Sequence, residues 1–242
     1  MIASTLLKRH GFTAVANVVG WDGCLDQSGK ETGRKGNRMN GERYMNIGIL
    51  LFDDVEVLDF CGPFEVFSVA AGLGAGSGGE PPFTVFTLAE HAGLVRAAGG
   101  LEVQPDYTID DHPPIDLLLV PGGWGTRREV DNPRLIDWLR AQDAQTTLTT
   151  SVCTGAFLLG RAGLLEGHRV TTHWGSVERL RRAFPGVTVL DNVRFVDEGK
   201  IVTSAGISAG IDMALHLVAR LQGEGLAHQT ARQMEYKPAA ES

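Results

Sequence analysis

The chain has 242 residues, of which 43% are hydrophobic and 21% are charged, a balance typical of an ordinary globular protein. Its formal net charge of −7 argues against a nucleic-acid partner, because phosphate contacts need clustered Lys and Arg. No apolar run reaches the roughly 18 residues of a membrane span, so we expect no membrane partner. Cys24, Cys61 and Cys153 have no metal-type spacing, so we expect no metal site. They also show no obvious disulfide pairing, which favours a reduced, cytoplasmic setting.

The first 44 residues differ from the rest of the chain. Residues 23–42 are polar and glycine-rich and lack apolar periodicity, as flexible linkers do. We therefore predict a flexible N-terminal arm over residues 1–44, one folded domain over 45–238, and a short tail over 239–242.

From Met45 onward, buried-strand patterns alternate with helical patterns. This alternation predicts an α/β, flavodoxin-like fold: a parallel sheet with helices on both faces. Two segments, 97–109 and 187–205, read as hairpin additions, the second turning at Asp197-Glu198-Gly199. The predicted strands cover 45–52, 83–90, 115–121, 147–152, 169–174 and 200–205. The predicted helices cover 63–71, a segment opened by Asn132-Pro133, 154–162, 176–183 and 208–221.

The segment TLTTSVCTGAFLLGRAGLL places Cys153 at a turn between a β-branched strand and an apolar helix. Such a turn holds a side chain exposed above the strand ends, as in a nucleophile elbow. The helix N-terminus that follows lowers a thiol pKa, and the thiolate is the nucleophilic form. We predict that Cys153 is a catalytic nucleophile that ionises below the free-cysteine value of about 8.5. A buried structural cysteine is the alternative.

Two further segments supply partners for the cysteine. Pro121-Gly122-Gly123-Trp124-Gly125 follows a buried strand, and its glycines let backbone N–H groups approach a ligand. With the N–H of Thr154, these groups could form an anion or oxyanion pocket. Asp59, in VEVLDFCGP, lies between apolar neighbours; burial would raise its pKa and suit it to proton transfer. The alternative is a helix cap before Pro63.

These segments together resemble the ThiJ/PfpI superfamily, the class I glutamine-amidotransferase-like fold, and most closely its isocyanide hydratase branch. The resemblance runs in order through LLFDDVEVLDFCGPFEVF, LLLVPGGWGTR, TSVCTGAFLLGRAGLLEGHRVTTHW, VTSAGISAGIDMALHL and QMEYKP, across residues 46–238. It implies that Cys153 is the nucleophile, Asp59 the acid beside it, and Thr154 the residue flanking the thiolate. It also implies a homodimer acting on a small molecule without a cofactor. We predict that the substrate contacts Gly122, Gly123, Trp124, His173 and Ile207; His173, at a predicted strand end, is alternatively a structural residue.

Departures from other branches narrow the activity. Protease-like and amidotransferase members carry His directly after the nucleophile, where this chain has Thr154, which argues against a Cys-His hydrolase. Glyoxalase-like and deglycase-like members use a Glu near the nucleophile, where this chain has Asp59. The same motif occurs in the ligand-sensing domain of AraC-type regulators, and we expect their helix-turn-helix module to be absent here. The insertion at 70–82 is expected near the dimer face and the cleft mouth.

The sequence therefore predicts an isocyanide hydratase, a lyase that yields an N-substituted formamide. A non-catalytic sensor domain and a glyoxalase or deglycase remain the alternatives.

Overall fold

The computed structural model describes residues 38–39, 42–76 and 78–239. Within these residues, seven strands form one central sheet in the order β12-β13-β9-β8-β3-β4-β7. All pairs in this sheet are parallel except β12 with β13, so the predicted parallel sheet with a hairpin addition is confirmed. The strands are β3 (Met45–Leu51), β4 (Phe83–Ala89), β7 (Tyr107–Thr108), β8 (Leu117–Val120), β9 (Leu148–Val152), β12 (Phe195–Glu198) and β13 (Ile201–Ser204).

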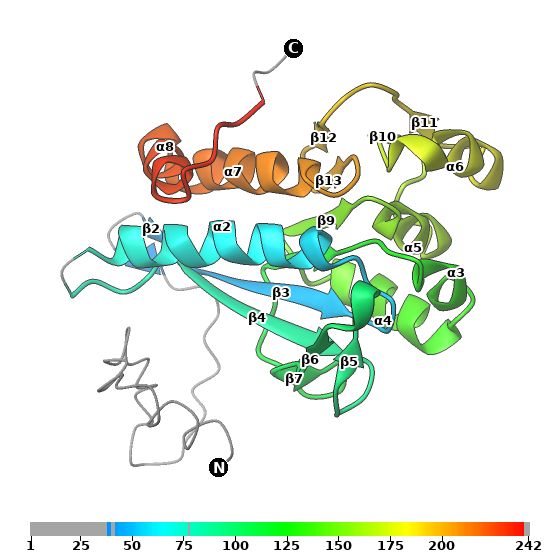
Figure 1. Ribbon diagram of the computed structural model, residues 1–242, viewed down its shortest axis with the longest axis horizontal. Helices are drawn as coiled ribbons and strands as arrows, with labels where there is room; N and C mark the ends of the chain where they lie inside the picture. The colour runs from blue at the N-terminus through cyan, green and yellow to red at the C-terminus, as the bar shows by residue number, and fades with distance from the viewer. Residues whose placement is uncertain (1–37, 40–41, 77, 240–242) are drawn as a thin grey trace, which may run out of the picture. The chain divides into compact units, whose positions relative to one another are not determined.

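Helices cover the sheet on both faces (Figure 1). The central strand β8 is LLLV and every residue in it is fully buried, as expected for a strand covered on both sides. On one face α2 (Val57–Ala75), α7 (Ala209–Gln222) and α8 (Glu224–Gln233) pack against one another. On the other face α5 (Gly155–Arg161) packs against β8 and β9, and against α3 (Thr126–Glu129) and α4 (Pro133–Asp143). This arrangement confirms the predicted fold class.

Helix α2 begins at Val57, six residues earlier than the sequence analysis predicted. The sequence predicts Pro63 as the first helical residue, a common position for proline, but it lies inside the helix. Burial of Phe60 and Asp59 in the preceding turns holds the helix there, even though Pro63 cannot donate to the Asp59 carbonyl. Asp59 is therefore inside the first turn, and the alternative of a cap before Pro63 is wrong.

Two predicted strand regions also differ from the structure. The segment 169–174 contributes only β10 (Arg169–Val170), which pairs with β11 (Thr188–Val189) outside the central sheet; α6 (Val177–Ala183) follows a short 3-10 turn. Within 97–109 no hairpin closes: β6 (Glu102–Val103) pairs with β5 (Val95–Arg96), and β7 joins the central sheet. Both errors have one cause, since a short β-branched run does not reveal which strand it pairs with.

Among the described helices, α2 alone is long and apolar enough, by length and composition, to cross a membrane. It packs against β3, β4, α7 and α8, which is the environment of a core helix. Its last turns and the loop after it form the insertion at 70–82. Pro82 accepts a hydrogen bond from the N–H of Met45, the first residue of β3 (3.0 Å), so this segment lies at the amino edge of the sheet, away from the strand ends that carry the site.

Residues 1–37 lie outside the described residues, and the flexible arm stays a prediction. Within the predicted arm over residues 1–44, the described strands β1 (Arg38–Met39) and β2 (Glu42–Arg43) form one short antiparallel pair.

Candidate active site

The carboxyl edge of the sheet brings the predicted site residues together. The loop after β8 carries Gly122 and Gly123, β9 leads into Cys153, and β13 leads toward Ile207. Because β8, β9 and β13 are parallel neighbours, these three loops emerge side by side. Asp59, on the first turn of α2, joins them: its carboxylate contacts the β8 loop directly.

Cys153 occupies a strained backbone position between β9 and α5. Its φ is +56°, in the left-handed region that costs a non-glycine residue about 1–2 kcal/mol. Its N–H faces the carbonyls of Ser204 and Ala205 (3.2 and 3.3 Å), and the hydroxyl of Thr172 donates to its carbonyl (2.7 Å). The surrounding structure thus holds the strain in place, and the tight turn predicted at Cys153 is confirmed.

The predicted exposure of the side chain is wrong: Cys153 is only 6% exposed, because the β8 loop packs against it. A Cβ at Gly122 would lie 2.8 Å from the Cβ of Cys153 and 2.5 Å from the N of Thr154, so only glycine allows the β8 loop to come this close. Glycine at this position therefore shapes the wall of the site.

The glycine N–H groups do not form the predicted oxyanion pocket. The N–H of Gly122 donates to Oδ2 of Asp59 (3.0 Å), and that of Gly123 donates to the hydroxyl of Thr154 (3.0 Å). Buried polar groups need partners, and here each N–H satisfies an internal acceptor rather than a vacant space. Thr154 thereby links the β8 loop to the turn that carries Cys153.

Asp59 is fully buried, and burial raises the pKa of its carboxyl from 3.8 to about 7. The hydrogen bond from Gly122 opposes this rise, and the nearby charge of Glu56 adds to it. The Cys153 thiol and the Ile207 amide lie close enough to lower the pKa somewhat. Neither reaches Oδ1 with full hydrogen-bond geometry, so among the described residues this oxygen has no partner. Asp59 thus combines a raised pKa with one oxygen that lacks a hydrogen-bond partner among the described residues.

The expected low pKa of the Cys153 thiol is not what the resting site provides. Burial raises its pKa to about 12, and the charge of Asp59 adds to the rise. The backbone and hydroxyl of Thr154 lower it, as the helix N-terminus suggested, but they are outweighed. Because the two groups interact, they titrate as a pair, and the pair gains its first negative charge as the pH rises through about 7. The raised pKa of the thiol favours Asp59 as the group that carries this charge.

The remaining predicted contacts lie around this pair. The amide of Ile207 is near Asp59, and Ile207 is itself left-handed, with φ +59°. Trp124 is 70% exposed and stacks with Arg127. His173 Nδ1 accepts the N–H of Gly175 (3.2 Å), and its ring packs against Gly206, whose Cβ would be 2.2 Å from Cδ2. The ring of His173 therefore supports the loop carrying Ile207, and its contact with substrate stays a prediction.

Several site residues were missed by the sequence analysis. Thr126 donates to Thr154 (3.1 Å), and Thr172 holds the Cys153 carbonyl. Arg179, on α6, lies near enough to Cys153 for their charges to interact. Thr126 follows directly on the glycine loop, which is a usable signal. Arg179 comes from a helix whose placement the sequence does not indicate.

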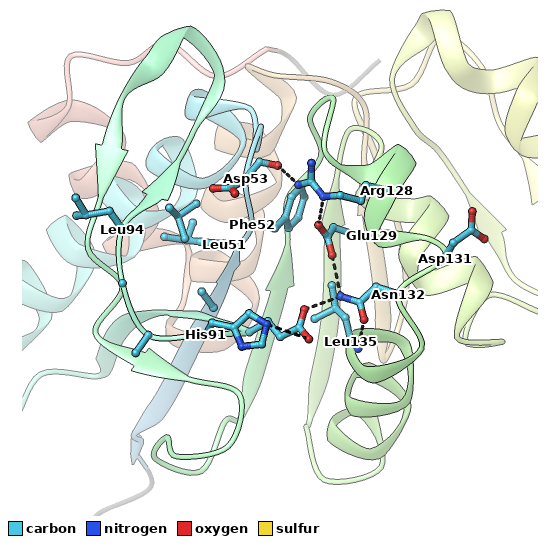
Figure 2. A pocket seen from close by; sticks show the side chains of 15 residues that line it. Leu51, Phe52, Asp53, His91, Leu94, Arg128, Glu129, Asp131, Asn132 and Leu135 are labelled. Atoms are coloured by element: carbon cyan, nitrogen blue, oxygen red, sulfur yellow. Dashed lines mark hydrogen bonds and ion pairs between the residues drawn. The ribbon is translucent and has the colours of Figure 1, made fainter.

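A separate hollow of about 490 Å³ opens between the ends of β3 and β4 and the start of α4 (Figure 2). None of the predicted site residues lines it. Its buried carboxyl, Glu129, accepts from Arg128 Nε (2.8 Å) and from the Asn132 amide (3.0 Å), as Figure 2 shows. Both oxygens of its buried carboxyl thus have donors within the hollow. The residues predicted to react lie instead around Cys153.

Residues 45–220 match the DJ-1/PfpI family. Isonitrile hydratase of Pseudomonas putida is 37% identical over 195 residues, 81% of this chain and 80% of that protein. The HTH-type transcriptional regulator GbdR of Pseudomonas aeruginosa (strain UCBPP-PA14) is 32% identical over 79% of this chain but only 51% of that protein, so this chain spans about half the regulator's length. A solved ThiJ/PfpI family protein from Pseudomonas syringae has a TM-score of 0.72 and 27% identity, covering 81% of this chain and 76% of that one.

Proposed function

The chain belongs to the DJ-1/PfpI family, and on that premise we propose that it is a cysteine-dependent hydratase that converts an isocyanide to an N-substituted formamide. The similarity to isonitrile hydratase covers four-fifths of both proteins. The geometry of Cys153 and Asp59 supports the same reaction.

One observation carries the proposal: both glycine N–H groups beside the thiol have internal acceptors. An acyl hydrolase needs such donors free, because attack on a carbonyl creates an oxyanion. Attack on an isocyanide places the developing charge on the terminal carbon, which a proton can neutralise. A thiol beside a basic carboxylate therefore fits the isocyanide better than an ester or amide.

In the first step the sulfur of Cys153 bonds to the terminal carbon of R–N≡C. Asp59 accepts the thiol proton as the bond forms and delivers it to the same carbon. The product is the thioimidate S–CH=N–R, and the carboxyl returns to its charged form. A pKa of about 7 suits this exchange, since proton transfer is most effective when donor and acceptor are nearly balanced.

In the second step a water molecule adds to the thioimidate carbon. Asp59 takes one proton from the water and passes it to the nitrogen, so the carboxylate is regenerated. The tetrahedral adduct S–CH(OH)–NH–R then breaks its C–S bond and releases the formamide OHC–NH–R. The hydroxyl proton returns through Asp59 to the sulfur. Covalent catalysis of this kind divides one difficult step into two easier ones.

A ligand-sensing role is the second candidate, favoured by the 32% identity to a transcriptional regulator over 79% of this chain. In that case the buried thiol would contact a ligand without reacting. Its pKa of about 12, which leaves it protonated at neutral pH, is compatible with this role as well.

The deciding experiment incubates the protein with an alkyl isocyanide, and separately with methylglyoxal, while ligand binding is followed by thermal shift. We expect formamide from the isocyanide, no turnover of methylglyoxal, and loss of formamide production in Cys153→Ala. Binding without turnover would favour the sensor. Loss of methylglyoxal with formation of lactate would favour a glyoxalase.

We further propose that the enzyme is a cytoplasmic homodimer. A thiol nucleophile requires a reducing compartment to remain reactive. Leu94 and Leu101, on the β5–β6 hairpin and well exposed in the monomer, are candidates for burial between two subunits. Sedimentation at micromolar concentration tests the dimer.

A further inference from the structure

Within the part of the chain that the structure describes, two arginines beside the candidate site have no acidic partner. Arg179, on α6, places its guanidinium carbon 4.2 Å from the ring centre of Phe157, on α5. The N–H of Phe157 donates to the carbonyl of Thr154 (3.0 Å), so Arg179 lies over the first turn after the nucleophile. Its Nε is buried and, among the described residues, has no hydrogen-bond partner.

Arg127, on α3, reaches the same region. Its guanidinium carbon lies 3.5 Å from the ring centre of Trp124, in the loop that also carries Gly122 and Gly123. No carboxylate of the described chain pairs with it, whereas its neighbour Arg128 pairs with both Asp54 and Glu129. Of these two neighbouring arginines, Arg128 has acidic partners and Arg127 has none among the described residues.

The two guanidiniums are close enough to repel each other. Burial lowers the pKa of the Arg179 guanidinium most, and the charge of Arg127 lowers it further. A charge on Cys153 raises it. Two like charges without an acid between them are unfavourable unless an anion joins them. The indole beneath Arg127 is itself open to solvent, since Trp124 is 70% exposed. Planar guanidinium groups supported by aromatic rings are well suited to bind a carboxylate through paired hydrogen bonds.

We propose that Arg127 and Arg179 bind the carboxylate of the substrate, and that the substrate class is isocyanides that carry a carboxylate near the isocyano group. This inference rests on the proposed hydratase function and deepens it. The product would be an N-formyl amino acid, whose carboxylate keeps the same two contacts while the formamide leaves Cys153. Neither arginine touches the reacting atoms, so both determine specificity rather than bond making.

The test compares two substrates with the same reacting group, isocyanoacetate and its methyl ester, which differ in charge. We expect the wild type to favour the anion in kcat/KM by at least tenfold. Arg127→Gln and Arg179→Gln should each reduce this preference by about tenfold, which removes most or all of it, and the double variant should show none. Arg182→Gln, an exposed arginine on the same helix, should keep the wild-type preference. A wild type that favours the ester, or variants that leave the preference unchanged, would overturn the inference.

A binding measurement separates this inference from the proposed reaction. N-formylglycine and its methyl ester are titrated calorimetrically into Cys153→Ala, alone and combined with Arg179→Gln. We expect the acid to bind at least tenfold more tightly than the ester, and the difference to disappear with Arg179→Gln. If wild type hydrates neither isocyanide while this binding difference holds, the reaction is wrong and the anion site stands. If acid and ester bind equally, the anion site is wrong whatever the enzyme hydrates.

Discussion

Two buried carboxyl groups at the carboxyl edge of the sheet have opposite surroundings. Glu129 lies beside the hollow of about 490 Å³. It accepts from Arg128 and from the Asn132 amide, so both of its oxygens have donors. Asp59, beside Cys153, receives one backbone hydrogen bond on Oδ2 and leaves Oδ1 without a partner. A buried carboxylate that lacks partners is costly, whereas a paired one contributes to local order.

The difference favours the region around Cys153 as the place where the proposed chemistry occurs. The hollow of about 490 Å³ contains a buried carboxyl, Glu129, whose two oxygens already have donors. Around Cys153 the structure instead retains a strained backbone, a raised pKa and an open acceptor. Such unsatisfied features persist only where the rest of the fold can support them, and they cluster at active sites. The following predictions test this contrast.

Removing the sulfur should have the largest effect. We expect Cys153→Ala to lower isocyanide turnover by at least about 1,000-fold, because no covalent adduct can form. Ligand binding should survive, since the rest of the site is intact. Formamide production followed by chromatography, together with calorimetric binding, measures both. Cys61→Ala, a thiol outside the site on α2, is the matched control and should retain near wild-type turnover.

Asp59→Asn should separate activity from stability. We expect turnover to fall about 100-fold or more, because the amide cannot accept the thiol proton. At pH 8 we also expect the variant to be more stable than wild type by about 2 kcal/mol, since it removes a buried charge with an open oxygen. Turnover assays and urea denaturation at two pH values measure the two effects.

The sign of the stability change follows from the raised pKa of Asp59. Its value of about 7 in the folded state exceeds the ordinary 3.8, so the folded protein holds this proton more tightly than the unfolded chain does. The contribution of Asp59 to stability therefore declines as pH rises from about 4 to about 7, and the full penalty applies above 7. The advantage of Asp59→Asn should shrink toward pH 4. An equal advantage at pH 4 and pH 8 would contradict the raised pKa.

The pH profile of the wild type sharpens the assignment of the charge. If Asp59 is the base, kcat/KM should rise about tenfold per pH unit up to about pH 7 and then level off. Thiolate absorbance should be absent at pH 8, because the pKa of Cys153 is raised to about 12. Thiolate absorbance already present at pH 7 would place the resting charge on sulfur and reverse the two roles.

The fold was largely predictable because its central strands are continuous apolar or β-branched runs. LLLV of β8 and LTTSV of β9 can be buried on both faces only in a covered parallel sheet. Predictions were wrong where pairing partners decide the structure, as in β10, or where tertiary burial outweighs a local preference, as at Pro63. Neither influence can be read from a short window of sequence.

The site was predictable as a set of neighbours but not in its electrostatics. Cys153, Asp59 and Gly122 were all predicted, because motifs at strand ends meet at one edge of a parallel sheet. The direction of the thiol pKa was wrong, since burial and a charge from a distant segment outweigh the adjacent helix end. Arg179 was missed because its position depends on how α6 packs against the rest of the fold, which the local sequence does not indicate.

The smallest effect on catalysis is expected from Glu129, the paired carboxyl. Glu129→Ala leaves the Arg128 guanidinium and the Asn132 amide each short of one acceptor, which should destabilise the fold by about 1–2 kcal/mol. Asn132 also caps α4 by accepting the N–H of Leu135 (3.4 Å), so the loss should loosen the start of that helix. Glu129→Gln, which keeps one oxygen acceptor, should lose about half as much. Turnover per folded molecule should stay within about threefold of wild type in both variants, because Glu129 has no contact with Cys153 or Asp59 among the described residues. A tenfold loss of kcat with normal stability would show that the hollow beside Glu129 takes part in the reaction. The contrast between the two carboxyl groups would then be wrong.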